Sequence, residues 1–222
     1  MNRLNRLMTG VASAALVVAA TSAFAKDDIT VAMQLEPPHL DPTSAAAGAI
    51  DSVLYTNVFE GLTRFMGDGS VVPGLAESWE ISEDGLTYTF KLREGVTFHD
   101  GTTMDAEDVK FTLDRINAED SANAQKALYA AISEVNVTDP QTVEVKLSEP
   151  NGNMLFNLAW GDAVIVAPET VETIKQTPIG TGAFKFENWN QGDKITLTRN
   201  DDYWGEAPAL PSATFKFISV PT

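Results

Sequence analysis

The chain has 222 residues, of which 15 are Lys or Arg and 31 are Asp or Glu, so its formal net charge is −16 at pH 7. A chain this acidic repels nucleic acid and anionic lipid, and the absence of cysteine excludes disulfides and thiolate metal sites. The fold must therefore rest on an apolar core, and the length suffices for one large domain or two small lobes.

Residues 1–25 have the three parts of a secretory signal peptide. Arg3 and Arg6 form a basic start, residues 7–25 carry no charge, and the run ends in an Ala-Phe-Ala site at residues 23–25. This order predicts cleavage after that site and a periplasmic location for the mature chain. A membrane-spanning helix is the alternative, but Gly, Ser and Thr residues dilute the apolar run.

The next elements are a strand and a helix. Residues 29–35 predict a buried strand, which the following Glu-Pro-Pro sequence ends. Residues 45–61 have apolar side chains at helical spacing, which predicts a helix there. The apolar positions are Ile50, Leu54, Val58 and Leu62.

From residue 84 the pattern changes to alternation. Residues 86–92 place apolar side chains on one face, and the Asp84-Gly85 pair before them predicts a hairpin turn. A helix is expected to begin near Asp105, whose side chain can cap the first turn, with Asp108 three residues on. Two further strand pairs follow, at 135–137 with 143–147 and at 184–189 with 195–197. Mixed strands and helices with many hairpins predict an α+β or mixed-sheet α/β fold.

Catalytic and metal-binding patterns are missing from the sequence. His39 and His99 are far apart and neither has a recognised ligand spacing, so structural or exposed roles are favoured for both. Gly180-Thr181-Gly182 leads into a predicted strand instead of a helix, which excludes a dinucleotide fingerprint. We therefore expect no enzyme activity, no metal and no cofactor, and we expect acidic pairs such as Glu83-Asp84 to be solvated.

Tryptophan marks one candidate binding position. Trp79, Trp189 and Trp204 lie beside strand patterns and turns, where packing roles are expected. Trp160 instead ends an apolar segment and precedes Gly161-Asp162. A ring in that setting can line a cleft, and a plain core position is the open alternative.

Several ordered motifs resemble one family. The stretches are LAESWE (75–80), GLTYTFKLR (85–93), VTFHDG (96–101), LDP (40–42), EGL (60–62), AEDVKF (106–111), GTGAFKF (180–186) and RNDDYWG (199–205). Together they resemble the family 5 extracellular solute-binding proteins, which are the peptide, dipeptide and nickel receptors of ABC importers. The resemblance extends over the chain that follows the signal peptide.

The fold that this resemblance implies is the periplasmic binding protein type II-like fold of the peptide-receptor type. Residues 26–50 and 178–222 would form an incomplete main sheet lobe, and residues 51–177 the extra subdomain. Family members are longer, so we expect the second lobe to be absent from this chain. In peptide-binding members that absent part supplies the acidic residue for the ligand's α-amino group and the basic residue for its carboxylate.

The resemblance also implies a ligand site. The positions that it implicates are Ala46, Ala47, Gly48, Asn123, Trp160 and Gly161. Ala46 and Ala47 are small where some peptide receptors carry a charged contact, so the identity of the ligand is open.

The expected function is therefore a monomeric periplasmic receptor that passes peptides or a similar small solute to an ABC permease in the inner membrane. One alternative is a truncated remnant of such a receptor that binds nothing, and DNA encoding a second lobe downstream would reveal it. A secreted hydrolase is a further alternative, and it would need turnover that is lost on replacement of His39 or His99.

Overall fold

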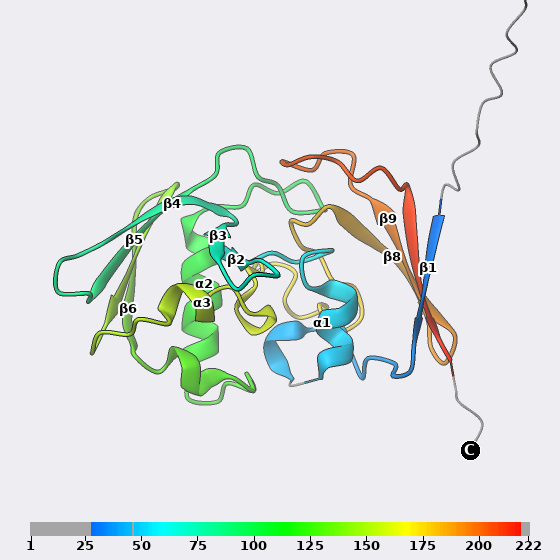
Figure 1. The fold of residues 1–222 in the computed structure, drawn as a ribbon, viewed down its shortest axis with the longest axis horizontal. Helices are drawn as coiled ribbons and strands as arrows, with labels where there is room; N and C mark the ends of the chain where they lie inside the picture. The colour runs from blue at the N-terminus through cyan, green and yellow to red at the C-terminus, as the bar shows by residue number, and fades with distance from the viewer. Residues whose placement is uncertain (1–27, 46, 219–222) are drawn as a thin grey trace, which may run out of the picture.

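Two four-stranded sheets lie at opposite ends of the molecule in the computed structural model, which describes residues 28–45 and 47–218 (Figure 1). The strand orders are β1-β10-β9-β8 in one sheet and β4-β5-β7-β6 in the other. The predicted signal peptide, Ala46 and residues 219–222 lie outside the described residues. Within the described residues, no helix is both long enough and apolar enough to cross a membrane.

The first sheet joins the beginning of the described chain to its end. β1 (Asp28–Met33) pairs in parallel with β10 (Ser212–Phe217), and β9 (Lys194–Arg199) and β8 (Phe184–Asn190) extend the sheet in antiparallel fashion. The predicted hairpin is thereby confirmed, and so is the existence of the first strand. Its predicted burial is wrong, because β1 lies at the edge of the sheet, where Ile29 is 43% and Val31 is 38% exposed. The alternating residues that point into the core are Ile195, Leu197, Ala213 and Phe215.

The second sheet consists of antiparallel hairpins. β4 (Ala76–Ile81) pairs with β5 (Thr87–Leu92), and β7 (Thr142–Leu147) joins β5 to β6 (Ile132–Asp139). The turn between β4 and β5 contains Gly85 at φ 69°, a left-handed conformation that glycine adopts without a steric penalty. The Asp-Gly turn signal and the alternating pattern of 86–92 are both confirmed, since Tyr88, Phe90 and Leu92 are buried.

Helix α2 (Ala106–Asn117) packs on the second sheet, against β6 and β7 (Figure 1). An Asp105 side-chain oxygen accepts a hydrogen bond from the Glu107 amide at 2.8 Å, and the Asp108 side chain accepts one from the Asp105 amide at 2.9 Å. The two bonds are part of a capping box, which satisfies amides that the first turn leaves free. The predicted start of this helix is therefore confirmed. Its buried stripe contains Val109, Leu113 and Ile116.

Helix α1 (Gly48–Leu54) is much shorter than the helix predicted over 45–61. The chain leaves the helix at Tyr55, whose ψ is 130°, and Thr56 has a φ of 59°. Val58 and Leu62 are nevertheless fully buried. The predicted helix is therefore wrong beyond Leu54, because a turn and an extended segment bury Val58 and Leu62 in place of further helix.

Short elements fill the space between the sheets. They are η1 (Pro42–Ser44), β2 (Thr63–Phe65), β3 (Val71–Pro73), η2 (Lys126–Tyr129), α3 (Met154–Asn157) and η3 (Gly161–Ala163). Strands β2 and β3 pair as an antiparallel ribbon.

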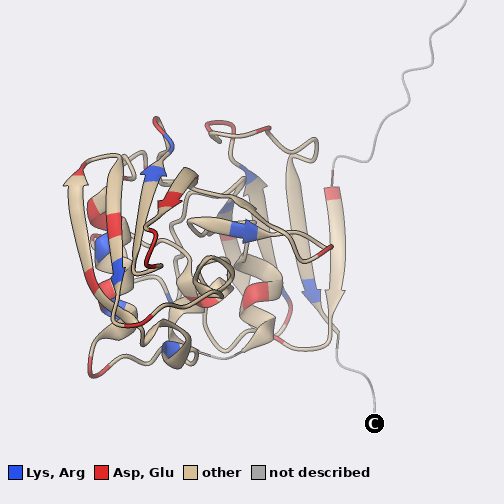
Figure 2. Cartoon of the chain, turned by 60° about the vertical axis from the view of Figure 1, so that its left-hand side comes forward, with Lys and Arg blue, Asp and Glu red and all other residues tan. Residues whose placement is uncertain are grey.

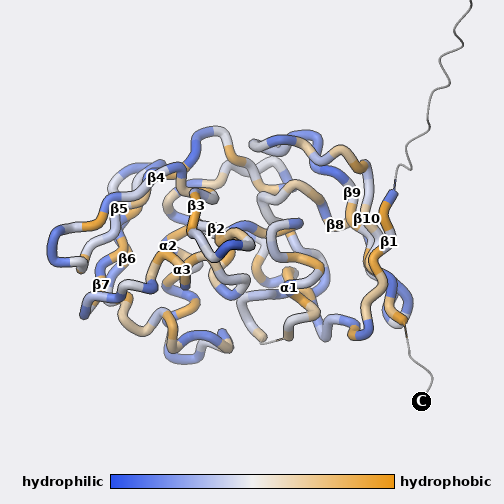
Figure 3. Tube along the Cα trace, viewed as in Figure 1, coloured by the Kyte–Doolittle hydropathy of each residue, from blue (hydrophilic) through white to orange (hydrophobic). Residues whose placement is uncertain are grey.

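The described chain has two apolar cores, one associated with each sheet, and hydrophobic stretches occur in both halves of the trace (Figure 3). Residues 163–167 run between the cores and contribute alternately to each of them. Ala163, Ile165 and Ala167 pack in the core of the second sheet, whereas Val164 and Val166 pack in the core of the first sheet. This extended segment thus holds the two cores together.

Candidate functional site

Four aromatic rings form a partly exposed surface near the middle of the molecule, which we call the aromatic surface: Tyr55, Phe65, Phe156 and Trp160. The Phe65 ring centroid lies 5.9 Å from that of Tyr55, 5.7 Å from that of Phe156 and 6.3 Å from that of Trp160. Phe156 and Trp160 meet edge to face at 6.1 Å. Phe65 is 36% exposed and Phe156 and Trp160 are each 37% exposed, so a ligand could contact these rings.

Backbone contacts hold the aromatic surface in place. The Tyr55 hydroxyl donates a hydrogen bond to the Ala159 carbonyl, and the Thr63 hydroxyl donates one to the Leu155 carbonyl at 2.7 Å. The end of α1 and strand β2 are therefore both tied to the segment that carries Phe156 and Trp160. Burial raises the pKa of Tyr55 to about 12, so its hydroxyl remains a donor at neutral pH.

The structure places several of the predicted site residues beside this surface. A Cβ atom on Gly161 would lie 2.4 Å from Oδ1 of Asp51 in α1, so only glycine allows this close approach. The Asn123 side-chain amide donates to the Asp162 carbonyl at 2.8 Å. Asn123 and Gly161 therefore meet at the same loop, and their role in ligand binding stays a prediction.

The loop before α1 contains the other predicted residues. Ala46 lies outside the described residues. Ala47 precedes α1 without a side-chain cap, and Gly48 is exposed at the first helical position. The remaining tryptophans differ from Trp160, because each is partly buried against a core.

Two carboxylates that the sequence reasoning missed lie next to Gly161. Asp51 is half-buried, and burial raises its pKa. Asp162 is 5% exposed, and burial together with the charge of Asp51 raises its pKa to about 6. A position next to Trp160 was the only signal for Asp162, and nothing in the sequence indicated that Asp51 would approach it.

A buried ion pair anchors the segment just before the predicted loop. Asp41 has no exposed surface and accepts from Arg115 at 3.0 Å and from the Thr43 amide at 2.9 Å. Burial opposes ionisation of Asp41, but the Thr43 hydroxyl and the Arg115 guanidinium outweigh it and keep the pKa of Asp41 below its usual value. The contact fixes η1 to helix α2 and so positions the start of α1.

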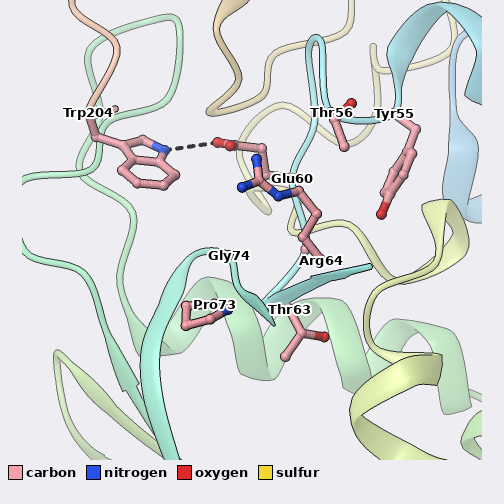
Figure 4. A pocket seen from close by; sticks show the side chains of 9 residues that line it. Tyr55, Thr56, Glu60, Thr63, Arg64, Pro73, Gly74 and Trp204 are labelled. Carbon is pink, nitrogen blue, oxygen red and sulfur yellow. Dashed lines mark hydrogen bonds between the residues drawn. The ribbon is translucent and has the colours of Figure 1, made fainter. Parts of the chain in front are cut away.

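A second buried carboxylate, Glu60, joins distant parts of the chain. It accepts hydrogen bonds from Thr181 at 2.9 Å, Tyr203 at 2.8 Å and Trp204 at 2.9 Å. Figure 4 shows the Trp204 indole directed at this carboxylate, with Arg64 beside it. The cavity there has a volume of about 10 Å³, room for about one water molecule, so it offers no space for a solute.

Both histidines make hydrogen bonds with the backbone. His99 Nε2 donates to the Gly182 carbonyl at 2.9 Å, and the Gly180 amide donates to its Nδ1 at 3.3 Å. Burial lowers the pKa of His99 to about 4, so the ring is neutral at neutral pH. His39 Nδ1 accepts from the Asp41 amide at 3.2 Å. These contacts confirm the predicted structural roles.

Comparison with known sequences identifies related proteins. Residues 70–222 match the profile described as "Bacterial extracellular solute-binding proteins, family 5 Middle". The chain is 35% identical to the glutathione-binding protein GsiB of Escherichia coli K12 over 229 residues, an alignment that covers 99% of this chain and 43% of that protein.

Solved structures show the same fold. The periplasmic binding protein AgaA of A. tumefaciens R10, in complex with agropinic acid, has a TM-score of 0.81 and 32% identity over 86% of this chain and 40% of its own. The oligopeptide-binding protein AppA of Bacillus subtilis, in complex with a nonapeptide, has a TM-score of 0.79 and 29% identity over the same shares. The present chain thus spans about two fifths of the length of these relatives.

Proposed function

Because the chain belongs to the family 5 bacterial extracellular solute-binding proteins, we propose that it binds a peptide or a similar small solute in the periplasm for delivery to an ABC permease. The family consists of solute-binding proteins and not of enzymes. The name of GsiB specifies glutathione, and the AppA structure contains a nonapeptide. These relatives support a peptide-like ligand for the present chain.

The observation that carries this proposal is the exposed aromatic surface around Trp160. Rings that remain one-third exposed beside a tightly packed glycine offer an apolar wall, which is the usual lining of a small-molecule site. Asn123 and α1 adjoin this wall through Asp162 and Asp51. We therefore assign Ala46, Ala47, Gly48, Asn123, Trp160 and Gly161 to the site.

The proposed lobes follow the same family pattern. Residues 26–50 and 178–222 would form the main sheet lobe, and residues 51–177 the extra subdomain. The pairing of β1 with β10 supports the first assignment, and the confinement of the second sheet to residues 76–147 supports the second.

Calorimetric titration of the 222-residue chain with glutathione and with di- to pentapeptides tests the function. We expect dissociation constants no tighter than the millimolar range, because the described residues provide one wall and a well-bound ligand is enclosed on most sides. Trp160→Leu should weaken this binding at least fivefold and leave the thermal midpoint of the free protein nearly unchanged.

Trp79→Leu is the matched control, because Trp79 lies on β4 and packs against Phe90. It should lower the thermal midpoint and leave the affinity unchanged. Equal affinities of the wild type and Trp160→Leu would remove Trp160 from the site, and micromolar binding would show that one wall suffices.

A further inference from the structure

The turn between β7 and α3 contains Asn151-Gly152, the one Asn-Gly pair in the sequence. The Asn153 amide donates a hydrogen bond at 3.0 Å to the side-chain oxygen of Asn151. The small ring that this bond closes includes both the Asn151 Cγ atom and the Gly152 nitrogen. The turn therefore keeps an amide nitrogen beside a side-chain carbonyl carbon, which is the arrangement that precedes cyclisation.

The Gly152 amide has no competing partner. Within residues 28–45 and 47–218 it donates no hydrogen bond, and Gly152 is exposed to solvent. The glycines of the three Asp-Gly turns differ, because their amides donate to backbone carbonyls at 2.8–2.9 Å. The aspartates before them are also poor targets for a nucleophile, since a carboxyl group is ionised at neutral pH. These glycines are Gly69, Gly85 and Gly101.

The Asn151 side chain presents a polarised carbonyl and an accessible leaving group. The hydrogen bond from Asn153 can stabilise the negative charge that develops on the side-chain oxygen when a nucleophile adds to Cγ. Nδ2 donates no hydrogen bond to any described residue. Among these residues, Ser44 Oγ is the one buried side-chain atom without a partner, so Nδ2 of Asn151 is in contact with water.

Two other asparagines form the same kind of turn but are protected. Asn123 and Asn200 accept from the amide two residues on, at 2.9 and 3.1 Å. Their side-chain amides donate to the carbonyls of Asp162 and Gly182 at 2.8 and 3.1 Å, and the two residues are 6% and 2% exposed. Burial excludes water from both, and the hydrogen bonds hold the nitrogen that would have to leave.

We propose that Asn151 is a modification site, at which Gly152 converts the asparagine through a cyclic imide into aspartate and isoaspartate. The Gly152 nitrogen forms a bond to Cγ of Asn151, the bond from Cγ to Nδ2 breaks, and the glycine N–H proton leaves with Nδ2 as ammonia. Water then adds to either carbonyl of the imide and opens the ring. The reaction needs water as its single co-reactant, and it is independent of the proposed function.

The isoaspartate product changes the backbone where two elements meet. The Asn151 carbonyl accepts from the Tyr88 hydroxyl of β5 at 3.0 Å and from the Met154 amide of α3 at 3.1 Å. In isoaspartate this carbonyl becomes part of a free carboxylate, and the main chain gains a methylene group. The change lies beside α3, which carries Phe156 of the aromatic surface. It also adds negative charge to a chain whose acidic residues are spread over strands, helices and loops (Figure 2).

Storage of the full chain in neutral buffer tests the proposal. Peptide mapping by mass spectrometry follows each asparagine over time, and chromatography separates aspartyl from isoaspartyl peptides. We expect Asn151 to be converted about tenfold faster than Asn123 and Asn200, because those two must first break a hydrogen bond on the leaving nitrogen. Isoaspartate should be present among the Asn151 products, since the imide can open on either side.

Gly152→Ala tests the role of the attacking residue without disturbing the fold. A Cβ atom at residue 152 would meet nothing within 4 Å. Conversion of Asn151 should slow about fivefold, because alanine lacks the backbone freedom with which glycine reaches the attacking geometry. The matched control is Gly67→Ala, another glycine with open space around its Cβ position, which should leave the rate unchanged.

A second measurement tests the structural consequence. The isoaspartyl form, separated by anion exchange, should have a lower thermal midpoint than Asn151→Asp, which has the same charge without the added methylene group. Equal midpoints would contradict the effect on the backbone between β5 and α3.

Three results would overturn the modification site itself. They are conversion of Asn151 no faster than that of Asn123, equal rates in Gly152→Ala and the wild type, and aspartate without isoaspartate. The last result would indicate direct hydrolysis of the side chain in place of attack by Gly152.

Discussion

His99 shows how a single side chain connects two distant loops. Its ring accepts from Gly180 and donates to Gly182, which only the neutral form with its proton on Nε2 can do. The sequence predicted a structural or exposed role for His99, because no second metal ligand occurs at a suitable spacing, and the two backbone contacts confirm a structural role. It could not identify the partners, since they lie about 80 residues away.

The buried neutral ring predicts a pH dependence of stability. The folded-state pKa of His99 is about 4 and the unfolded value is near 6.5, so between these values the unfolded chain binds more protons. The contribution of His99 to stability is therefore complete above about pH 6.5 and declines as the pH falls toward 4. His99→Gln should remove this decline, about 2–3 kcal/mol, when urea unfolding is measured at both ends of the range.

His39→Gln is the control for this measurement. Burial also lowers the pKa of His39, but this residue is closer to the surface. A His39 variant that flattens the pH profile as strongly as the His99 variant does would contradict the assignment.

The candidate site also shows what individual residues reveal before the structure is known. Trp160 and Gly161 were identifiable because an aromatic ring beside glycine at the end of an apolar run is unusual. Asp51, Phe65 and Phe156 were not identifiable, since each has an ordinary local pattern and reaches the site through a turn of the chain. The meeting of α1, β2 and α3 depends on the tertiary fold, which the spacing of residues within one segment does not predict.

At the scale of elements, the sequence predicted a helix boundary correctly where a nearby side chain hydrogen-bonds to the backbone. The start of α2 follows from a capping side chain that competes for free amides within three residues. The length of α1 does not follow in this way, because spacing of apolar residues specifies which side chains are buried and leaves the backbone path open. The turn at Tyr55 and Thr56 takes the chain from one core to the ribbon without exposing Val58.

The capping interaction of α2 is testable by substitution. Asp105→Ala removes the acceptor of the Glu107 amide, and loss of such a cap typically costs about 1 kcal/mol. The free energy of unfolding, measured by denaturant titration, should fall accordingly, whereas the exposed control Glu119→Ala should change it by less than about 0.5 kcal/mol. Equal shifts in the two variants would refute the role of the cap.

At the scale of the whole molecule, Glu60 links elements far apart in the sequence. Its donors come from residues 181, 203 and 204, so one carboxylate ties the ribbon to the segments on both sides of β8 and β9. Burial raises the pKa of Glu60, and the three hydrogen bonds oppose that rise. The sequence did not predict that these side chains meet, because Glu60, Thr181 and the Tyr203–Trp204 pair are far apart in the chain.

Trp204→Phe tests the strength of this link. The variant retains an aromatic ring beneath Arg93, which lies 4.6 Å from the Trp204 ring, but loses the indole donor to Glu60. We expect the free energy of unfolding to fall by about 1.5–3 kcal/mol, the range for a hydrogen bond to a charged group. Trp79→Phe removes an indole N–H that has no hydrogen-bond acceptor in the described chain. The free energy of unfolding, measured with urea, should therefore fall less in this variant. Equal decreases in the free energy of unfolding of the two variants would contradict a stabilising role for the Trp204–Glu60 hydrogen bond.

The parallel pairing of β1 with β10 has a consequence for the timing of folding. Asp28 and Ser212 are partners although they are about 180 residues apart, so the first strand has no place in the sheet until the last strand exists. At ordinary rates of synthesis, roughly 5–20 residues per second, that interval is roughly 10–40 s. The hairpins of the second sheet, whose partners are close in sequence, can form during this time. Among the described elements, the first sheet is therefore completed after the hairpins of the second sheet.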